Sequence, residues 1–308
     1  MGLPVIKFDK KEIDLYSKTN FDFDKIKNLK RFNDVNYQKY LRYLSLNIKS
    51  ILTCSVDDLD KIAKNFKKII DFKNKLKCTN RIGRKNCSNC SNCKKNILDN
   101  EFVSKIQEVL KYSSNSLSPY FKGRTNSACY ICNAQYTIFA NNSKGSKLIF
   151  EFDHYYPKSL FPGLSVSLYN LIPICGSCNK FKGNREYDIK RMHSNLKFEL
   201  DNLSLGNYLT KGLKLSIKIN DVTNISKKFY LSEIYEHHTD YIEELIQRKI
   251  KYNNAYKSKL EKKFGRIVGN FSAIENRLEL GTYTSNEGIY KRPLSKFLQD
   301  INDQLNSL

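Results

Sequence analysis

Two Cys-x-x-Cys pairs that bracket a short stretch of chain are the strongest constraint on how this sequence can fold. Cys129 and Cys132 form the first pair, and Cys175 and Cys178 form the second. Each pair can turn tightly enough to place two thiolates on one ion, and four thiolates complete a tetrahedral structural zinc site. We therefore expect Zn²⁺ to join the ends of a segment too small to bury a stable core alone. A site filled by four sulfurs leaves no open position for catalysis.

A second group of cysteines lies upstream, in a basic stretch at residues 78–95. Its members are Cys78, Cys87, Cys90 and Cys93. Positive neighbours favour the thiolate form, and four sulfurs again suit zinc. The spacing is also similar to one bacterial ferredoxin pattern, but the Cys-Pro that ends that pattern is missing. A second zinc site, an iron–sulfur cluster and no metal at all are three alternatives. Without metal, we expect this stretch to be a disordered loop.

The charge of the chain favours a polyanionic partner. The sequence has 53 lysines and arginines against 31 acidic residues, a formal net charge of +22. Nucleic acid, and DNA in particular, rewards such an excess through phosphate contacts and counterion release. The first residues have no apolar segment of signal-peptide length, and no apolar run approaches a membrane span. We therefore expect the cysteines to be metal ligands in the reducing cytoplasm, with no membrane association.

Apolar periodicity predicts an α+β fold in which mainly helical regions flank a small central module. The expected helices cover 35–53, from a Ser55 cap to about Lys77, 100–112, Phe229 to about Phe264, and Leu294–Leu305. A strand is expected near Val5–Phe8 and, from alternation, over Leu213–Ile219. Residues 113–118, followed by Pro119, are expected to be a boundary. We divide the chain into an N-terminal helical region (1–115), a central domain (119–190) and a C-terminal, mainly helical region (191–308).

The stretch between the two central cysteine pairs carries the polar residues that suit chemistry. An apolar, strand-like run over Leu148–Asp153 ends at Asp153 and His154. A second short strand is expected over Asn170–Ile174, and a short helix from Gly176 to about Phe181. Asn179 follows the last cysteine directly. Each of these polar residues has an ordinary explanation by itself, as a strand end, a turn or a helix cap.

Taken together, these motifs resemble the HNH endonuclease family, also called ββα-metal nucleases. The resemblance is confined to residues 129–183 and rests on the two cysteine pairs, Asp153-His154 with Pro157, Asn170-Leu171, and Asn179-x-x-Lys182-Gly183. The last motif residue is Asn rather than His, a variation the family allows. Outside this range, residues 291–300 are loosely similar to bacterial HNH proteins found near phage-defence genes.

The resemblance implies a role for each motif residue. His154 would be the general base that deprotonates water, and Asn170 would brace the loop and orient the imidazole. Asp153 and Asn179 would offer hard oxygens to one Mg²⁺ or Mn²⁺ ion. Lys158, Lys182 and Arg185 are candidate phosphate contacts.

The sequence thus predicts a metal-dependent DNA endonuclease, with a role in bacterial defence or restriction. The alternative is a zinc module that binds nucleic acid without cleaving it. An ATPase or sensor partner protein, docked on the long helices, is a further hypothesis. A homodimer is another, because one HNH site cuts one strand.

Overall fold

The computed structural model describes residues 9–19, 25–26, 28–80, 87, 89–111, 114–121, 127–142, 145–185, 195–266 and 277–308. Within these ranges the fold is mixed α+β, mainly helical with short two-stranded sheets. The strand expected near Val5–Phe8 lies outside them. No helix in the described ranges combines the length and the apolar character that crossing a membrane requires.

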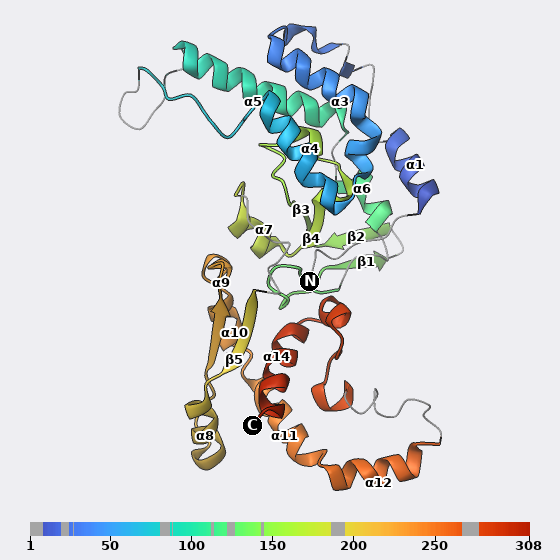
Figure 1. The fold of residues 1–308 in the computed structure, drawn as a ribbon, viewed down its shortest axis with the longest axis vertical. Helices are drawn as coiled ribbons and strands as arrows, with labels where there is room; N and C mark the ends of the chain where they lie inside the picture. The colour runs from blue at the N-terminus through green and yellow to red at the C-terminus, as the bar shows by residue number, and fades with distance from the viewer. Residues whose placement is uncertain are drawn as a thin grey trace.

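Helices form one end of the molecule, and the strands of the central stretch lie beside them (Figure 1). The elements are α1 (Lys10–Thr19), the 3-10 helix η1 (Asn28–Arg31), α3 (Val35–Thr53), α4 (Val56–Ile69), α5 (Ser91–Val109) and α6 (Ser114–Phe121). The helix predicted over 35–53 coincides with α3. Asp34 caps α3 by accepting a hydrogen bond from the Asn36 amide, and the apolar positions of the helix are buried,.

Helix α4 ends well before the predicted limit at Lys77. Ser55 caps its start as expected, because the Asp58 amide donates to Ser55 Oγ. Ile70 then adopts an extended conformation, with φ −142° and ψ 125°. Asp71 accepts from the Lys73 amide, which closes a turn that competes with the helix,. The predicted helix extended too far because Phe72, although it lies beyond the end of α4, is buried against Tyr40 and Phe102 and so continues the apolar pattern.

Two further boundaries in the N-terminal half differ from prediction. Helix α5 begins at Ser91 rather than near residue 100, because Cys90 caps it: the Cys93 amide donates to Cys90 Sγ over 3.4 Å. The segment taken as a boundary before Pro119 is the helix α6. Leu117 and Phe121, one helical turn apart, are fully buried, so tertiary burial overrides the Ser/Asn-rich composition.

Three antiparallel hairpins supply all the strands in the described part of the chain. β1 (Ile138–Asn142) pairs with β2 (Gly145–Ile149), β3 (Glu151–His154) with β4 (Leu171–Ile174), and β5 (Leu196–Leu200) with β6 (Ile217–Asp221). The run predicted as one strand over Leu148–Asp153 is divided at the buried Phe150 between β2 and β3, which belong to different sheets. The strand expected over Leu213–Ile219 begins later, as β6, and its partner β5 was not predicted.

The C-terminal region combines the hairpin β5–β6 with helices, of which α9, α10 and α14 pack against it. They are α8 (Asn202–Lys211), α9 (Ile225–Lys228), α10 (Leu231–Glu236), α11 (Asp240–Lys251), α12 (Asn254–Phe264) and α14 (Ser295–Asn306), with the 3-10 helix η5 (Asn286–Lys291) before the last. The long helix expected over Phe229–Phe264 is three helices instead. Tyr230 has φ 54° before α10, and Asn253 caps α12 by accepting from the Tyr256 amide. These breaks hardly shift the spacing of the apolar residues, so the sequence pattern resembles that of one long helix.

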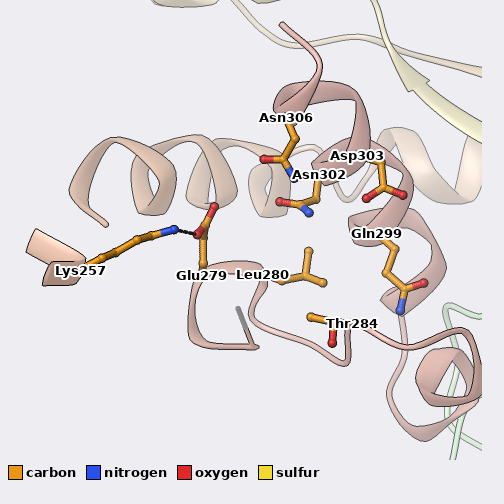
Figure 2. Close-up of a pocket in the computed structure, with 8 residues that line it drawn as sticks. All are labelled: Lys257, Glu279, Leu280, Thr284, Gln299, Asn302, Asp303 and Asn306. Carbon is orange, nitrogen blue, oxygen red and sulfur yellow. Dashed lines mark hydrogen bonds and ion pairs between the residues drawn. The ribbon is translucent and has the colours of Figure 1, made fainter. Parts of the chain in front are cut away.

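A polar pocket of about 340 Å³ lies beside α14 in this region (Figure 2). The Glu279 carboxylate in its wall accepts from Lys249 Nζ at 2.9 Å and from Lys257 Nζ at 2.6 Å. Its lining contains neither histidine nor cysteine. The ion pairs tie α11 and α12 to the segment that leads into α14.

Apolar side chains of the described residues gather in two clusters, and the hairpin β3–β4 lies between them. The first cluster joins the N-terminal helices to Phe150, Phe152 and Leu171. The second joins the C-terminal region to the central cysteines, Ile172 and Ile174. Alternate residues of β4 thus face different clusters, and all of β4 is buried,. The predicted central segment 119–190 contributes to both cores.

The N-terminal helices also hold the loop 155–170 that connects β3 to β4. The Gly163 amide donates to Tyr40 Oη at 2.9 Å, and Tyr156 Oη donates to Asp60 at 2.8 Å. Tyr16 Oη donates to the Val166 carbonyl. The loop includes the 3-10 helices η2 (Pro162–Leu164) and η3 (Leu168–Asn170), whose apolar residues are buried in the first cluster.

We predict that Gly163→Ala destabilises the protein by about 1–3 kcal/mol, the usual result of overpacking a tight core. A Cβ at Gly163 would lie 2.3 Å from Phe66 Cζ on α4. The matched control is Gly206→Ala on the exposed face of α8, where a Cβ meets nothing within 4 Å. That variant should gain roughly 0.5–1 kcal/mol from helix propensity. Urea unfolding compares the two, and equal effects would contradict the packing described here.

Candidate functional site

The four central cysteines come together at the junction of the two cores. Cys129 and Cys132 precede β1, Cys175 lies between β4 and α7 (Gly176–Lys182) as the N-cap residue of that helix, and Cys178 lies in α7. All four are buried, and their Sγ atoms lie within 4.8 Å of one another. Cys132 Sγ and Cys175 Sγ are 3.9 Å apart. A tetrahedral site with Zn–S bonds of about 2.3 Å places its sulfurs ~3.8 Å apart, so the group can hold such an ion.

Contacts among the four sulfurs shift the pKa values of these thiols in opposite directions. Hydrogen bonds from the neighbouring sulfurs lower the pKa of Cys175, with Cys129 the largest cause. The same contacts raise the pKa of Cys178. The thiolate forms of Cys132 and Cys175 are thus favoured over those of Cys129 and Cys178, and a cation in the centre would favour the thiolate form of all four,.

Asn133 connects the first cysteine pair to the C-terminal segment. Its backbone has φ 53°, a left-handed conformation that Asn tolerates,. Its Nδ2 donates to the Ile289 carbonyl at 2.9 Å, and its Oδ1 accepts from the Lys296 amide at 3.1 Å. The segment 291–300, singled out in the sequence, thus begins its helix against the first cysteine pair.

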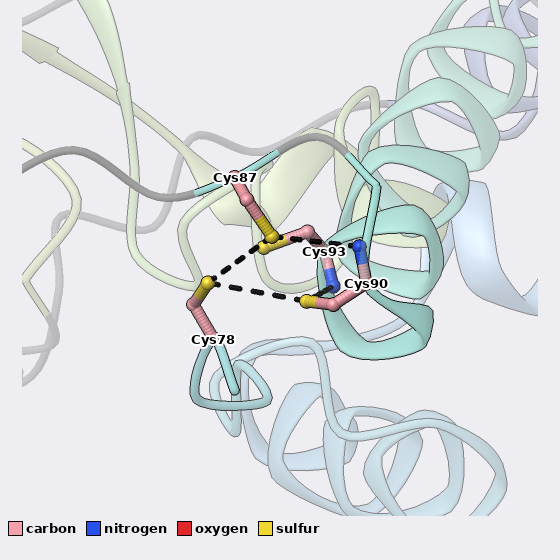
Figure 3. Close-up of side chains that lie close together, drawn as sticks. All are labelled: Cys78, Cys87, Cys90 and Cys93. Carbon is pink, nitrogen blue, oxygen red and sulfur yellow. Dashed lines mark hydrogen bonds between the residues drawn. The ribbon is translucent and has the colours of Figure 1, made fainter. Parts of the chain in front are cut away.

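The sulfurs of the second cysteine group, at residues 78–93, also lie close together (Figure 3). Cys78 Sγ lies 3.4 Å from Cys87 Sγ and 3.9 Å from Cys90 Sγ, and the four Sγ atoms lie within 4.8 Å of one another. The Cys90 amide donates to Cys87 Sγ at 3.4 Å, the tight turn expected of a Cys-x-x-Cys pair,. A hydrogen bond from the Cys93 amide is the largest cause that lowers the pKa of Cys90 to about 5.

Two asparagines of α5 hold the remote cysteine of this group in place. Asn96 accepts from the Leu76 amide at 3.1 Å and donates to the Leu76 carbonyl at 2.8 Å. Asn92 donates to the Lys77 carbonyl at 2.7 Å. Cys78 is therefore positioned by contacts that need no metal. Sequence reasoning missed both asparagines, although their spacing of one helical turn was visible.

A pocket of about 570 Å³ lies beside the central cysteines. Asp153 and His154 line it from β3, Lys158 from the following loop, and Asn179 and Lys182 from α7. The structure therefore brings together five of the residues selected from the sequence. Glu151, two residues before Asp153 on β3, lines it too.

His154 is buried at the pocket, with 5% of its surface exposed. Its Nε2 lies 2.9 Å from the Ser165 carbonyl. A carbonyl oxygen only accepts hydrogen bonds, so Nε2 carries the proton and the neutral ring keeps a lone pair on Nδ1. Burial lowers the pKa of His154 to about 3, so the ring is neutral at physiological pH. Nδ1 is therefore the ring nitrogen that would accept a proton, and burial makes it a weak base in this structure.

Asn170 fixes the loop that supplies the Ser165 carbonyl. It is fully buried. Its Oδ1 accepts from the Tyr156 amide at 2.7 Å, and its Nδ2 donates to the carbonyls of Leu164 and Tyr156, at 2.9 and 3.1 Å. Its own carbonyl accepts from the Tyr155 amide. One side chain therefore joins the two ends of the loop around the imidazole.

Asp153 and Lys182 form a buried ion pair across β3 and α7. Lys182 Nζ donates to Asp153 Oδ1 at 3.0 Å and to the His154 carbonyl at 2.8 Å. Lys182 is only 1% exposed. It is therefore not available as a surface contact for phosphate, the role predicted from the sequence. The other oxygen, Asp153 Oδ2, is buried without a hydrogen-bond partner among the described residues.

The remaining predicted phosphate contacts lie at the edge of the pocket and beyond α7. Lys158 is half-buried in the pocket wall, and burial lowers the pKa of its ammonium. Arg185 is exposed just after α7, where its amide donates to the Lys182 carbonyl at 3.2 Å. Neither position conflicts with a role in binding phosphate.

The chain matches no protein-family model, no curated protein and no solved structure. What the protein does must be argued from its own side chains.

We predict that the purified protein carries two zinc ions per chain, one for each cysteine group. Cys175→Ser and Cys90→Ser should each remove one ion, because a structural zinc site needs all four ligands. Cys54→Ser is the control, since Cys54 is buried outside both groups, with its Sγ 3.4 Å from Ser167 Oγ. Mass spectrometry of metal content after gel filtration measures the outcome. Retention of both ions by Cys175→Ser would contradict the assignment.

We predict that Lys182→Met destabilises the protein by about 3–5 kcal/mol, because the buried Asp153 carboxylate loses its cation. Lys180→Met, on the exposed side of the same helix, should change the free energy of unfolding by less than about 0.5 kcal/mol. Urea unfolding of the zinc-loaded variants is the measurement. Similar stabilities for the two variants would mean that the ion pair does not support the site.

Proposed function

We propose that the protein is a metal-dependent HNH endonuclease that hydrolyses phosphodiester bonds in DNA. The observation that carries the proposal is the pairing, in one pocket, of a neutral oriented imidazole with a buried carboxylate oxygen that has no partner among the described residues. The order of elements supports it: β3, a long loop, β4 and α7 follow the strand, strand, helix sequence of that family, and four cysteines close the ends.

The pocket suits a hard divalent cation such as Mg²⁺ or Mn²⁺. Lys182 neutralises one oxygen of Asp153 and leaves Oδ2 in the buried wall. Asn179 adds an amide oxygen from α7, and oxygen ligands are those that these ions prefer. A bound ion there would supply positive charge for the scissile phosphate and for the departing oxygen.

The residues of the chain supply the remaining steps. His154 Nδ1 takes a proton from a water molecule as that water attacks phosphorus, while the bond from phosphorus to the leaving oxygen breaks. The Ser165 carbonyl holds the imidazole in the required tautomer and stabilises the positive charge that it gains. Asn170 and the N-terminal helices hold the loop that carries this carbonyl. Lys158 and Arg185 attract the phosphates of the strand.

The net charge of +22 supports nucleic acid as the substrate,. The two cysteine groups support a structural role for Zn²⁺. A zinc ion held by four sulfurs has no open position for substrate, so it would be distinct from the catalytic ion. The loose similarity of residues 291–300 to HNH proteins found near phage-defence genes supports a setting in bacterial defence or restriction.

We predict that His154→Ala lowers cleavage of plasmid DNA by about 10²–10⁴-fold in Mg²⁺ or Mn²⁺, the usual contribution of a general base. DNA affinity and zinc content should stay unchanged. The control is His237→Ala, which removes an exposed histidine at the end of α10.

Cleavage by His154→Ala at the parental rate would overturn the mechanism. Metal-independent DNA binding without cleavage by the parent would instead favour the alternative, a zinc module that only binds nucleic acid.

A further inference from the structure

The side chain of Asn179 is held in the pocket by a hydrogen bond to Glu151, in addition to the position that α7 gives it. Asn179 Nδ2 donates to Glu151 Oε2, across the gap between α7 and β3. Glu151 lies two residues before Asp153, so both side chains project from the same face of β3 and line the same pocket,. The motif residues selected from the sequence did not include Glu151.

The contact determines which way the amide of Asn179 points. A glutamate carboxylate at neutral pH accepts hydrogen bonds and donates none. Only the NH₂ group of Asn179 can therefore face Glu151, and the carbonyl oxygen Oδ1 must point elsewhere. A flipped amide would set two oxygens against each other and would offer a donor where a metal ion needs an oxygen.

The position of the Glu151 carboxylate is itself constrained. Glu151 pairs with Ile174 in the β3–β4 ladder, next to the residue where the second cysteine pair begins. An ideal Cβ at Gly176 would lie 3.3 Å from Glu151 Oε1. The carboxylate thus passes close over the first turn of α7, where a glycine leaves it room, and reaches Asn179 one turn further along.

We propose that Glu151 is a positioning residue that fixes Asn179 with its carbonyl oxygen available to the divalent ion. The inference rests on the proposed function, because it concerns the same ion. It assigns Glu151 to the support of a ligand, the role that outer-shell hydrogen bonds have at metal sites.

The test is a titration of the zinc-loaded protein with Mn²⁺, followed by electron paramagnetic resonance in the absence of DNA. The Mn²⁺ ion that is lost in the Asp153→Asn variant is taken as the one bound in the pocket. Glu151→Gln should weaken binding of that ion about tenfold, the lower end of the loss when an outer-shell partner is removed. Glutamine can pair with either orientation of the Asn179 amide and so no longer selects one. The control Glu233→Gln removes an exposed carboxylate on α10 and should leave the affinity unchanged.

A double-mutant cycle separates positioning from two other roles. Asn179→Asp presents oxygens in both orientations, so Glu151→Gln should have less than about a twofold effect in that background. A ligand that touches the ion, or a carboxylate that attracts it through space, would lose affinity equally in both backgrounds. An equal loss, or an unchanged affinity of the single variant, overturns the proposal.

The same titration distinguishes this inference from the proposed function. If Mn²⁺ binding follows the predicted pattern but the parent protein cleaves neither DNA nor RNA, in single- or double-stranded form, the nuclease proposal fails and the role of Glu151 stands. If the parent binds no ion that Asp153→Asn removes, Asn179 has no ion to serve and the inference fails.

Discussion

The antiparallel pairing of β3 with β4 is the constraint on which both cores and the candidate site depend. Leu171 packs into the N-terminal cluster, while Ile172 and Ile174 pack into the C-terminal one. The same register places Asp153 opposite Ile172 and ends β4 at the second cysteine pair. A slip of one residue would exchange the two faces of β3 and turn Asp153 toward the N-terminal apolar cluster,. The pairing of β3 with β4 therefore fixes the position of the central cysteine group relative to the polar pocket.

Polar groups at this junction are costly to bury, and Asp153 Oδ1 and His154 Nε2 each have a partner from a different element, whereas Asp153 Oδ2 has none among the described residues,. α7 supplies Lys182 for Asp153, and the loop supplies the Ser165 carbonyl for His154. Helices of the N-terminal region hold that loop, and α14 packs against the first cysteine pair through Asn133. These contacts from several elements hold Asp153 and His154 in place, as the electrostatic preorganisation of the proposed catalytic site would require,. The cysteine group at α5 lies in a separate part of the chain.

Local patterns predicted elements well where the apolar period and the burial agree. α3 coincides with the predicted range because its buried face follows the helical period without interruption. The pattern over 229–264 also kept that period, yet the chain breaks at Tyr230 and Asn253. A turn that does not shift the apolar period cannot be detected from that period. Helix α6 was missed for another reason: it forms in a Ser/Asn-rich segment because Leu117 and Phe121 are buried. Propensity is a weak guide wherever tertiary packing decides.

For the site, the spacing of the cysteines was sufficient to predict that their sulfurs meet. The grouping of Asp153, His154 and Asn179 was expected only from the resemblance to the HNH family, and the three residues do line one pocket. Only the tertiary structure decided how each is used. Lys182 looked like a surface cation and is instead buried against Asp153. Glu151 looked like an ordinary strand residue and instead holds Asn179. The physical reason is that spacing reflects local geometry, whereas burial and hydrogen bonding between β3 and α7 depend on segments that meet only after the chain has folded.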